Sequence, residues 1–405
     1  MKILQINAVN GIKSTGRTTL EASEYYKELG YDSKIAYSVG THEKNNYIIG
    51  NELDRKSHGL LSRVSGKQGY FSKKETRKLL DFINKFNPDI VHLRNLHSNY
   101  INLNLLLKYL GENDIATVIT LHDCWFYTGK CTHYTLDNCN KWENGCYNCP
   151  RLKKDNPSWF FDRTPEMYSD KKHLYENIPR LAVVGVSNWI TEEAKKSILS
   201  NSLIITRIYN WVDLNVFKPR NIESLKKELN LTNKFVLLGV ASFWSMSKGI
   251  DKFLELSKKI SEDTSILLVG KVPSGTIFPE NIVHIEETNN TEELAQLYSL
   301  ADVLINFSLE ETFGKVTAEA IACGTPAIAI NSTANPELVG PGCGYVINDD
   351  NIDSIMNSLE KVKIRGKQAF SNECINYARI NFSKNDRLSE YIDVYEELIS
   401  AEGAS

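Results

Sequence analysis

Apolar and polar residues alternate along the first half of the chain in a way that predicts strands and helices in turn. Residues 3–6 form a compact apolar run, and a loop rich in Gly, Ser and Thr separates it from a helical pattern that begins near Thr18. Similar apolar runs occur at 89–93, 117–121 and 181–186. Runs that are apolar on both faces and separated by helical segments predict a parallel sheet with helices on both sides.

The same pattern restarts in the second half of the chain. Four more apolar runs occur there, at 235–240, 265–270, 301–307 and 325–330. A helical pattern at 249–260 separates the first two of them. Two successive series of this kind predict two doubly wound α/β domains. We expect the first domain to cover 1–205 and the second to cover 206–383, with the connection inside the segment 204–217.

The composition is that of an ordinary soluble globular protein. Of the 405 residues, 42% are hydrophobic and 24% are charged, and the 47 Lys and Arg nearly balance the 50 Asp and Glu, for a net charge of −3. This balance argues against a general nucleic-acid-binding protein. No apolar run reaches the roughly 18 residues of a membrane helix, and the first residues form a strand pattern rather than a signal peptide. We therefore expect a cytoplasmic protein with no nucleic-acid partner.

One segment departs from this neutral balance. Residues 54–78 hold eight Lys or Arg against two acids, and a helical pattern with one apolar face follows. Two interpretations stay open: the polar face of an ordinary surface helix, or a patch attracted to anionic lipid head groups or to a phosphate-bearing acceptor. On the second interpretation, residues 55–78 make a peripheral contact with an anionic membrane.

Five of the eight cysteines lie within one short stretch. Four of them follow the spacing Cys131-x7-Cys139-x6-Cys146-x2-Cys149. A Cys-x2-Cys pair is typical of zinc sites, and four thiolates suit tetrahedral Zn²⁺; His133 is a possible replacement for one cysteine. Reduced thiols packed in a loop, and disulfides, are the alternatives. We predict a structural zinc site here, separate from any catalytic role.

The densest candidate chemistry follows the third apolar run of the second half. There Gly314 lets the backbone approach a ligand closely. Lys315 and Val316 then begin a helix whose first N–H groups and positive dipole end attract an anion. Glu311 and Glu319 lie on either side of that helix start. Two carboxylates in this arrangement suit a ligand that carries hydroxyl groups on both sides of a phosphate.

Together with Phe313 and Gly324-Thr325-Pro326, this pattern resembles the signature of the retaining glycosyltransferases of family 4, the group 1 glycosyltransferases, which have the GT-B fold. Two other stretches are similar to the same family. Asn210-Trp211-Val212-Asp213 resembles its interdomain segment, and Lys248-Gly249 resembles its Lys-Gly at a helix start. The resemblance covers nearly the whole chain. The run Leu121-His122-Asp123-Cys124-Trp125, with the cysteines after it, is similar to the bacterial subset that assembles surface polysaccharides.

The resemblance implies an α/β protein of GT-B architecture, with two facing doubly wound Rossmann-like domains and an interdomain cleft. Residues 1–205 would bind the acceptor, residues 206–383 would bind the nucleotide sugar, and a helix within 384–405 would pack back on the first domain. The implied reaction transfers a hexose or N-acetylhexosamine, with retention, from a nucleotide diphosphate sugar, with UDP favoured. The acceptor would be a glycan or lipid-linked saccharide of a capsule or O-antigen type, at the inner face of the plasma membrane.

The resemblance also assigns roles to single residues. Glu319 would hydrogen-bond the ribose, Glu311 would contact hydroxyls of the transferred sugar, and Lys248 would neutralise the leaving diphosphate. His122 would contact the donor sugar, and Gly16 would lie near the phosphates and the acceptor. The expected catalytic residues are Glu311, His122 and Lys248. The expected donor-binding residues are Glu319, Phe313, Gly314, Lys315, Val316 and Gly16, and the acceptor-side candidates are Arg94, Asn95, His97 and Arg17.

No Asp-x-Asp pair occurs in the chain, so we expect catalysis without a metal ion. A preorganised lysine and helix N–H groups would stabilise the charge that develops on the leaving phosphate. Three positions depart from the family pattern. Ser242 stands where a basic residue is usual, and Trp211 replaces the usual Gly. Arg94 stands where the polysaccharide subset commonly has His, and it would either meet a phosphate or pair with an acid at the surface.

Two other functions are weighed against this one. A non-catalytic scaffold that binds a nucleotide sugar and partners another transferase would agree with the loss of the basic residue at Ser242. A dinucleotide-dependent oxidoreductase would agree with two doubly wound domains. The chain, however, has no strand followed by Gly-x-Gly-x-x-Gly and a helix, which such an enzyme uses to bind its cofactor.

Overall fold

The computed structural model describes residues 1–348 and 351–401. Contacts within the chain divide it into two compact units. Unit 1 comprises Met1–Ile208 and Leu388–Ser405, and unit 2 comprises Tyr209–Arg387. The divisions expected from the sequence and its resemblance, at 205/206 and 383/384, lie three and four residues before these.

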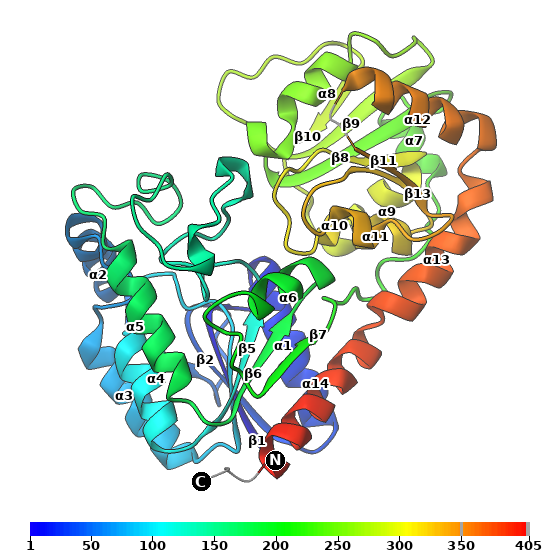
Figure 1. The fold of residues 1–405 in the computed structure, drawn as a ribbon. Coiled ribbons are helices and arrows are strands. Elements are labelled where there is room, and N and C mark those ends of the chain that lie inside the picture. The colour runs from blue at the N-terminus through cyan, green and yellow to red at the C-terminus, as the bar shows by residue number, and fades with distance from the viewer. Residues whose placement is uncertain (349–350, 402–405) are drawn as a thin grey trace. The chain divides into compact units, whose positions relative to one another are not determined.

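Unit 1 is built on a seven-stranded parallel sheet with the order β3-β2-β1-β4-β5-β6-β7 (Figure 1). The apolar runs of the first half form four of its strands: β1, β4, β5 and β6. The other strands, β2, β3 and β7, were not predicted. The strand bounds are β1 (Lys2–Asn10), β2 (Asp32–Gly40), β3 (Tyr47–Ile48), β4 (Ile90–Leu93), β5 (Ala116–Leu121), β6 (Leu181–Gly185) and β7 (Ile204–Arg207).

Helices connect these strands. Their bounds are α1 (Lys13–Glu28), α2 (Glu52–Ser65), α3 (Lys73–Phe86), α4 (Leu103–Glu112), α5 (Thr164–Glu176) and α6 (Asn188–Lys195), with short 3₁₀ turns η1 (Thr135–Asp137) and η2 (Lys141–Glu143). The first helix begins at Lys13 rather than near Thr18, so Gly16 lies inside it. A Cβ on Gly16 would come within 3.1 Å of Val9 Cγ2 and 3.3 Å of the Gly11 nitrogen. Gly16 therefore allows the helix to pack closely on the loop that precedes it.

The last helix, α14 (Lys384–Ser400), packs on unit 1 through two buried tyrosines. Its Tyr395 hydroxyl lies 3.0 Å from the Tyr26 hydroxyl and 2.6 Å from His92 Nδ1. The hydroxyl of Tyr391 lies 3.0 Å from Thr120 Oγ1. Complete burial, with a further contribution from nearby positive charge, holds the pKa of His92 well below its usual value. The helix is thus attached through a neutral polar network inside the core.

Unit 2 has a six-stranded parallel sheet with the order β10-β9-β8-β11-β12-β13. Its strands are β8 (Phe235–Phe243), β9 (Thr264–Lys271), β10 (Ile282–Ile285), β11 (Val303–Asn306), β12 (Ala327–Ile330) and β13 (Gly344–Ile347). The other elements are α7 (Glu223–Glu228), η3 (Met246–Lys248), α8 (Ile250–Leu256), α9 (Thr291–Leu300), α10 (Lys315–Ala322), α11 (Asn335–Leu338), α12 (Ile352–Arg365) and α13 (Gln368–Phe382). Two parallel sheets with connecting helices confirm the predicted α/β class.

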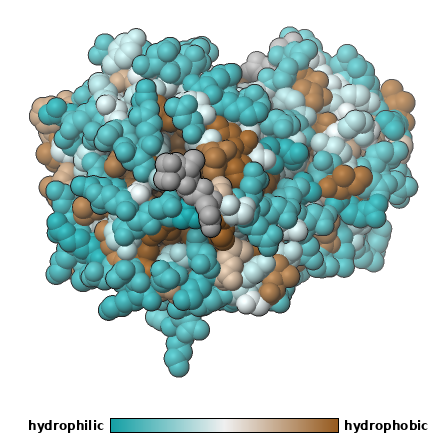
Figure 2. All heavy atoms as spheres, turned by 60° about the horizontal axis from the view of Figure 1, so that its bottom comes forward, coloured by the Kyte–Doolittle hydropathy of each residue, from teal (hydrophilic) through white to brown (hydrophobic). Residues whose placement is uncertain are grey.

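Apolar strands form the core of each unit, and side chains on both faces of the two sheets are buried. Figure 2 shows a face on which hydrophilic residues predominate and apolar residues gather in scattered patches. Within the described residues, no helix combines the length and apolar character that crossing a membrane requires.

Candidate functional site

The carboxyl ends of β8 and β11 place the predicted chemistry of unit 2 at one edge of its sheet. These two strands are neighbours in the parallel sheet, so the segments that follow them leave from the same edge. Lys248 lies in η3 after β8, and Glu311 lies in the loop between β11 and α10. This edge, where the strands end, is where ligands bind in open α/β sheets.

Lys248 and Glu311 form the central ion pair of this edge. Lys248 Nζ donates to Glu311 Oε1 at 2.5 Å and to Ser308 Oγ at 3.0 Å. The side chains are 35% and 19% exposed, so both are half-buried and still reachable by a ligand. Gly249 allows this approach, because a Cβ there would lie 2.3 Å from Phe307 Cβ and its φ is +78°. The Lys-Gly pair therefore holds an ammonium group against a carboxylate at the rim of the sheet.

The loop after β12 fixes the backbone of Glu311. The Glu311 N–H donates to Thr333 Oγ1 at 2.9 Å, and its carbonyl accepts from the Ala334 N–H at 3.2 Å. Thr333 has a φ of +49°, a strained conformation for a β-branched residue. Such strain persists where the surrounding structure enforces it, and it is frequent at binding sites. Two loops thus set the position of one carboxylate.

A buried polar network supports the same loop from below. Asn306 Nδ2 donates to Thr317 Oγ1 and to Asn335 Oδ1, each at 3.1 Å. Asn335 Nδ2 donates to the Ser308 carbonyl at 2.7 Å, and the Ser308 N–H donates to Asn306 Oδ1 at 3.0 Å. Buried amides that satisfy one another in this way make a loop rigid. Ser308, which bonds Lys248, is therefore held in place before any ligand arrives.

Helix α10 begins directly beside this pair. Gly314, with a φ of +89°, is its N-cap, and no side chain caps the helix start. The first N–H groups of a helix have no partner within it, so those of Lys315 and Val316 suit an anion. Glu319 lies one turn further on, is 5% exposed, and accepts a hydrogen bond of 3.0 Å from the Tyr298 hydroxyl through Oε2. The Tyr298 bond fixes the direction of this carboxylate.

The side chain of Phe313 differs from its predicted role in donor binding. It is buried, and its ring centroid lies 6.0 Å from that of Tyr209 and 5.6 Å from that of Phe382. Its side chain therefore belongs to the core of unit 2. The backbone of Phe313 remains as the part that a ligand can contact.

In unit 1, His122 directly follows β5 and contacts Arg94, which directly follows β4. Arg94 is completely buried, so of its two predicted roles the ion pair at the surface is wrong. Its Nε donates to Gln5 Oε1 at 3.0 Å, and its Nη1 lies 3.4 Å from His122 Nε2. A guanidinium only donates hydrogen bonds, so this contact is favourable when His122 Nε2 is the accepting nitrogen. Arg94 contacts and orients His122 from inside the core of unit 1, and its charge does not face solvent.

The other three acceptor-side candidates, His97, Asn95 and Arg17, have different surroundings. His97 Nε2 lies 2.8 Å from Asp123 Oδ2; burial acts to lower the pKa of His97, but the Asp123 carboxylate outweighs it and raises that pKa. The carbonyl of Asn95 accepts from the Tyr100 hydroxyl at 2.8 Å, which ties the backbone of the loop. Arg17 is exposed on α1. His97 thus positions the residue next to His122, whereas Arg17 is available to solvent.

The four cysteines of the predicted zinc site line one small pocket in unit 1, of about 20 Å³. Cys131 Sγ and Cys149 Sγ are 3.6 Å apart, and Cys146 Sγ accepts the Gly129 N–H at 3.2 Å. The hydrogen bond from Cys131 lowers the pKa of Cys149 to about 7. Residues 1–348 and 351–401 contain no group of three or more Cys, His, Asp or Glu side chains arranged for a metal ion. All eight cysteines are free thiols, and the zinc site stays a prediction.

Metal analysis of the purified protein tests this prediction. If the loop binds zinc, protein prepared under reducing, chelator-free conditions is expected to contain stoichiometric zinc, and Cys146→Ser with Cys149→Ser is expected to lose it. The double variant Cys323→Ser with Cys343→Ser, in unit 2, serves as the control that keeps the metal. Absence of stoichiometric zinc from the unaltered protein would remove the idea.

Sequence analysis missed several residues that hold the predicted ones in place. Ser308, Thr333 and Tyr298 contact Lys248, the Glu311 backbone and Glu319, respectively. Ser308 could have been predicted from the sequence, because it is a small polar residue at the end of an apolar run. Tyr298 and Thr333 carry no such signal, since their contacts depend on how α9 and the loop after β12 pack.

Two family models match the chain. One, described as Glycosyltransferase Family 4, matches residues 15–216, and the other, described as Glycosyl transferases group 1, matches residues 221–380. Together they span both units and include the edge at Lys248, Glu311 and Glu319.

Individual proteins resemble the chain at sequence identities of 23% and 29%. "Putative colanic acid biosynthesis glycosyl transferase WcaC" of Escherichia coli K12 is 23% identical over 333 residues, which is 77% of each protein. The N-acetyl-alpha-D-glucosaminyl L-malate synthase of Bacillus anthracis is 29% identical over 173 residues, 40% of this chain and 45% of that protein. The first match spans most of both chains, and the second spans less than half of either.

Solved structures share the fold along its length. The sucrose-phosphate synthase of Thermosynechococcus elongatus has a TM-score of 0.74 at 14% identity and covers 99% of this chain and 100% of its own. HepE of Anabaena, in complex with UDP and glucose, has a TM-score of 0.65 at 16% identity, over 98% and 100%. Both are GT-B structures. With this fold and with both family models matched, the chain belongs to the group 1 glycosyltransferases, family 4.

Proposed function

We propose that the protein transfers a hexose or N-acetylhexosamine, with retention, from a nucleotide diphosphate sugar to a glycan or lipid-linked saccharide. UDP is the favoured nucleotide, and surface-polysaccharide assembly at the cytoplasmic face of the membrane is the proposed setting. The Lys248–Glu311 pair beside the start of α10 carries this proposal. WcaC, whose name places it in colanic acid biosynthesis, and HepE, solved with UDP and glucose, support the choice of process and nucleotide.

The ion pair suggests how donor binding proceeds. Without a ligand, the charge of Lys248 is balanced by Glu311 at 2.5 Å. A diphosphate at the start of α10 would compete for the ammonium group, and Glu311 would then be free to accept hydrogen bonds from sugar hydroxyls. As the bond to the sugar breaks, negative charge grows on the leaving phosphate, and Lys248 with the α10 N–H groups stabilises it. Catalysis without a metal ion rests on the absence of an Asp-x-Asp pair from the sequence.

Two further residues complete the proposed roles. Glu319 accepts hydrogen bonds from the ribose, with its direction set by Tyr298. His122 contacts the transferred sugar, with its ring oriented by Arg94. Retention follows from attack on the same face of the sugar, with the leaving phosphate taking the proton of the acceptor hydroxyl. Unit 2 would thus bind the donor, and unit 1 would bind the acceptor.

Replacing Glu319 by alanine is expected to weaken binding of the nucleoside diphosphate by about ten- to a hundredfold, because hydrogen bonds to a charged group contribute about 1.5–3 kcal/mol. Isothermal titration with UDP and with GDP measures the effect. Tyr298→Phe removes only the bond that directs the carboxylate, and should weaken binding less. Glu292→Ala, at an exposed position on α9, is the matched control. Unchanged nucleotide binding in Glu319→Ala would contradict the ribose assignment.

A donor screen tests the function as a whole. The purified protein is incubated with UDP- and GDP-sugars, with and without acceptor saccharides, and release of the nucleoside diphosphate is followed. Turnover with one donor supports the transferase. Binding of a donor with no turnover under any condition favours the scaffold, for which Ser242, exposed at the end of β8, is the supporting observation.

A further inference from the structure

Helix α2 has its apolar and polar faces reversed. Its buried residues are His58, Gly59 and Ser62, which are polar or small. Its leucines and valine instead face solvent. Leu53 is 75% exposed, and three others are exposed as well: Leu60, Leu61 and Val64. Leu53, Leu60 and Val64 follow the spacing i, i+7, i+11 of a single helical face, so the stripe that usually meets a core points away from it.

An aromatic run extends this face. Trp159, Phe160 and Phe161 are all exposed, Phe160 by 66%. The Trp159 N–H donates to the carbonyl of Arg63 on α2 at 2.7 Å. A Cβ on Gly66, at the end of α2, would lie 2.4 Å from the Phe161 carbonyl oxygen. Residues 159–161 therefore adjoin the C-terminal end of α2, and the outward face of α2 together with these residues is called the α2 surface below.

Basic residues border the α2 surface. The segment 55–67 contains Arg55, Lys56, Arg63 and Lys67 and no acid, while Glu52 at the start of α2 pairs with Lys56 and Glu166 of α5 pairs with Lys67. Arg163 lies 5.5 Å from the centre of the Phe161 ring, and Lys153 donates to the Trp159 carbonyl. An exposed helix face of leucines and valine, with Lys and Arg on the same helix and Trp and Phe in the adjoining loop, is typical of proteins that bind at the surface of a bilayer.

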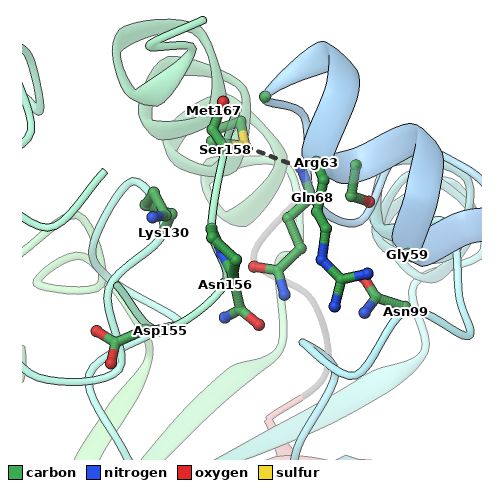
Figure 3. Close-up of a pocket in the computed structure, with 12 residues that line it drawn as sticks. Gly59, Arg63, Gln68, Asn99, Lys130, Asp155, Asn156, Ser158 and Met167 are labelled. Atoms are coloured by element: carbon green, nitrogen blue, oxygen red, sulfur yellow. Dashed lines mark hydrogen bonds between the residues drawn. The ribbon is translucent and has the colours of Figure 1, made fainter. Parts of the chain in front are cut away.

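A polar pocket of about 100 Å³ lies beside the surface, between α2 and the loop before Trp159. Arg63, Asn99 and Asn156 reach into this space (Figure 3). A guanidinium and side-chain amides suit the phosphate and hydroxyl groups of a lipid head group. An apolar surface beside such a pocket matches the two parts of a phospholipid.

We propose that the α2 surface docks on a bilayer rich in anionic phospholipid. Lys and Arg next to an anionic bilayer gain favourable energy from its negative surface potential, and the leucines and aromatic rings gain by leaving water. The α2 surface differs from the predicted segment 55–78, because it includes residues 159–161 and does not depend on the basic residues of α3. The membrane setting of this proposal rests on the proposed function. Vesicle binding, however, is measured without any sugar donor and tests docking alone.

Flotation of the full chain with vesicles tests the proposal. We expect binding to phosphatidylcholine vesicles that contain phosphatidylglycerol, little binding to phosphatidylcholine alone, and weaker binding as salt rises. Leu60→Glu with Leu61→Glu, and separately Trp159→Ser with Phe160→Ser, should lower the bound fraction about tenfold or more. Arg63→Gln should weaken binding and reduce its dependence on salt. The control, Leu203→Glu with Ile364→Glu, alters exposed apolar residues elsewhere and should bind like the unaltered chain.

Three outcomes would overturn the proposal. One is that the unaltered chain stays in the unbound fraction with both vesicle types, and another is that the two α2-surface variants float as well as the control. A dimer that Leu60→Glu with Leu61→Glu dissociates, without vesicle binding, would identify a second copy of the chain as the occupant. Because these substitutions are on the surface, circular dichroism and thermal melts should match the control. Donor turnover measured without vesicles separates failure of docking from failure of the proposed function.

Discussion

Replacing Glu311 by glutamine is expected to lower the rate of sugar transfer by about a hundred- to a thousandfold without weakening the binding of the nucleoside diphosphate. In the proposed mechanism the carboxylate contacts the sugar and not the nucleotide, so its loss should affect the reacting centre and spare nucleotide binding. Glutamine keeps the size of the side chain and leaves the Thr333 and Ala334 bonds to the backbone in place. The measurement combines transfer kinetics with isothermal titration of UDP.

The choice of donor sharpens this test. If Glu311 binds a sugar hydroxyl, the loss in Glu311→Gln should shrink with a deoxy analogue that lacks that hydroxyl, because both enzymes then lack the same bond. Glu292→Gln, exposed on α9, should transfer at the unaltered rate. A Glu311→Gln variant that transfers at full rate would show that the role assignment is wrong.

Hydrophobic periodicity predicted the central strands of both sheets and missed most strands nearer the edges. β1, β4, β5 and β6 are continuous apolar runs because helices cover both faces of the inner strands. β3 has only two residues, and β7 is half-buried along its length. Neither carries a strong pattern. Edge strands obtain their position from pairing with a neighbour, and that pairing is not visible in local sequence.

The start of α1 shows a second limit. The loop pattern of Gly11 to Gly16 indicated an irregular segment, yet the helix begins at Lys13. Gly16 is helical here because its missing side chain allows the close approach to Val9 and Gly11. Tertiary packing overrides the weak helix propensity of glycine.

The candidate site was predictable in its residue types and not in its contacts. The spacing of Glu311 and Glu319 and the Lys-Gly pair were readable from the chain. The salt bridge between Lys248 and Glu311 joins residues 63 apart, and only the pairing of β8 with β11 brings them together. Arg94 illustrates the opposite case, since the sequence left open both a contact with a phosphate and an ion pair at the surface. Its burial follows from its place directly after β4, between His122 and Gln5.

Replacing Lys248 by methionine is expected to reduce transfer by about a hundred- to a thousandfold through loss of charge stabilisation on the leaving phosphate. Methionine keeps the length of the apolar stem, so packing beside Gly249 is retained. If Lys248 acts on the diphosphate, as proposed, the loss of rate in Lys248→Met should be the same for donors with different sugars, including the deoxy analogue that reduces the effect of Glu311→Gln. Kinetics with both donors make this comparison.

The double variant Lys248→Met with Glu311→Gln decides whether the ion pair is part of the mechanism. In the proposed mechanism the two residues separate on donor binding and act on different parts of the donor. The free-energy losses in kcat/KM of the two single variants should therefore nearly add in the double variant. If the pair is only structural, the second substitution should cost little after the first, because each single change already breaks it. Lys248→Arg keeps the charge and should recover part of the rate.

A double variant as active as Lys248→Met alone, with both singles impaired equally for every donor, would contradict separate roles for the two residues. The salt bridge itself contributes little to stability at 35% and 19% exposure, about 1 kcal/mol or less, so thermal melts of all four proteins should agree closely.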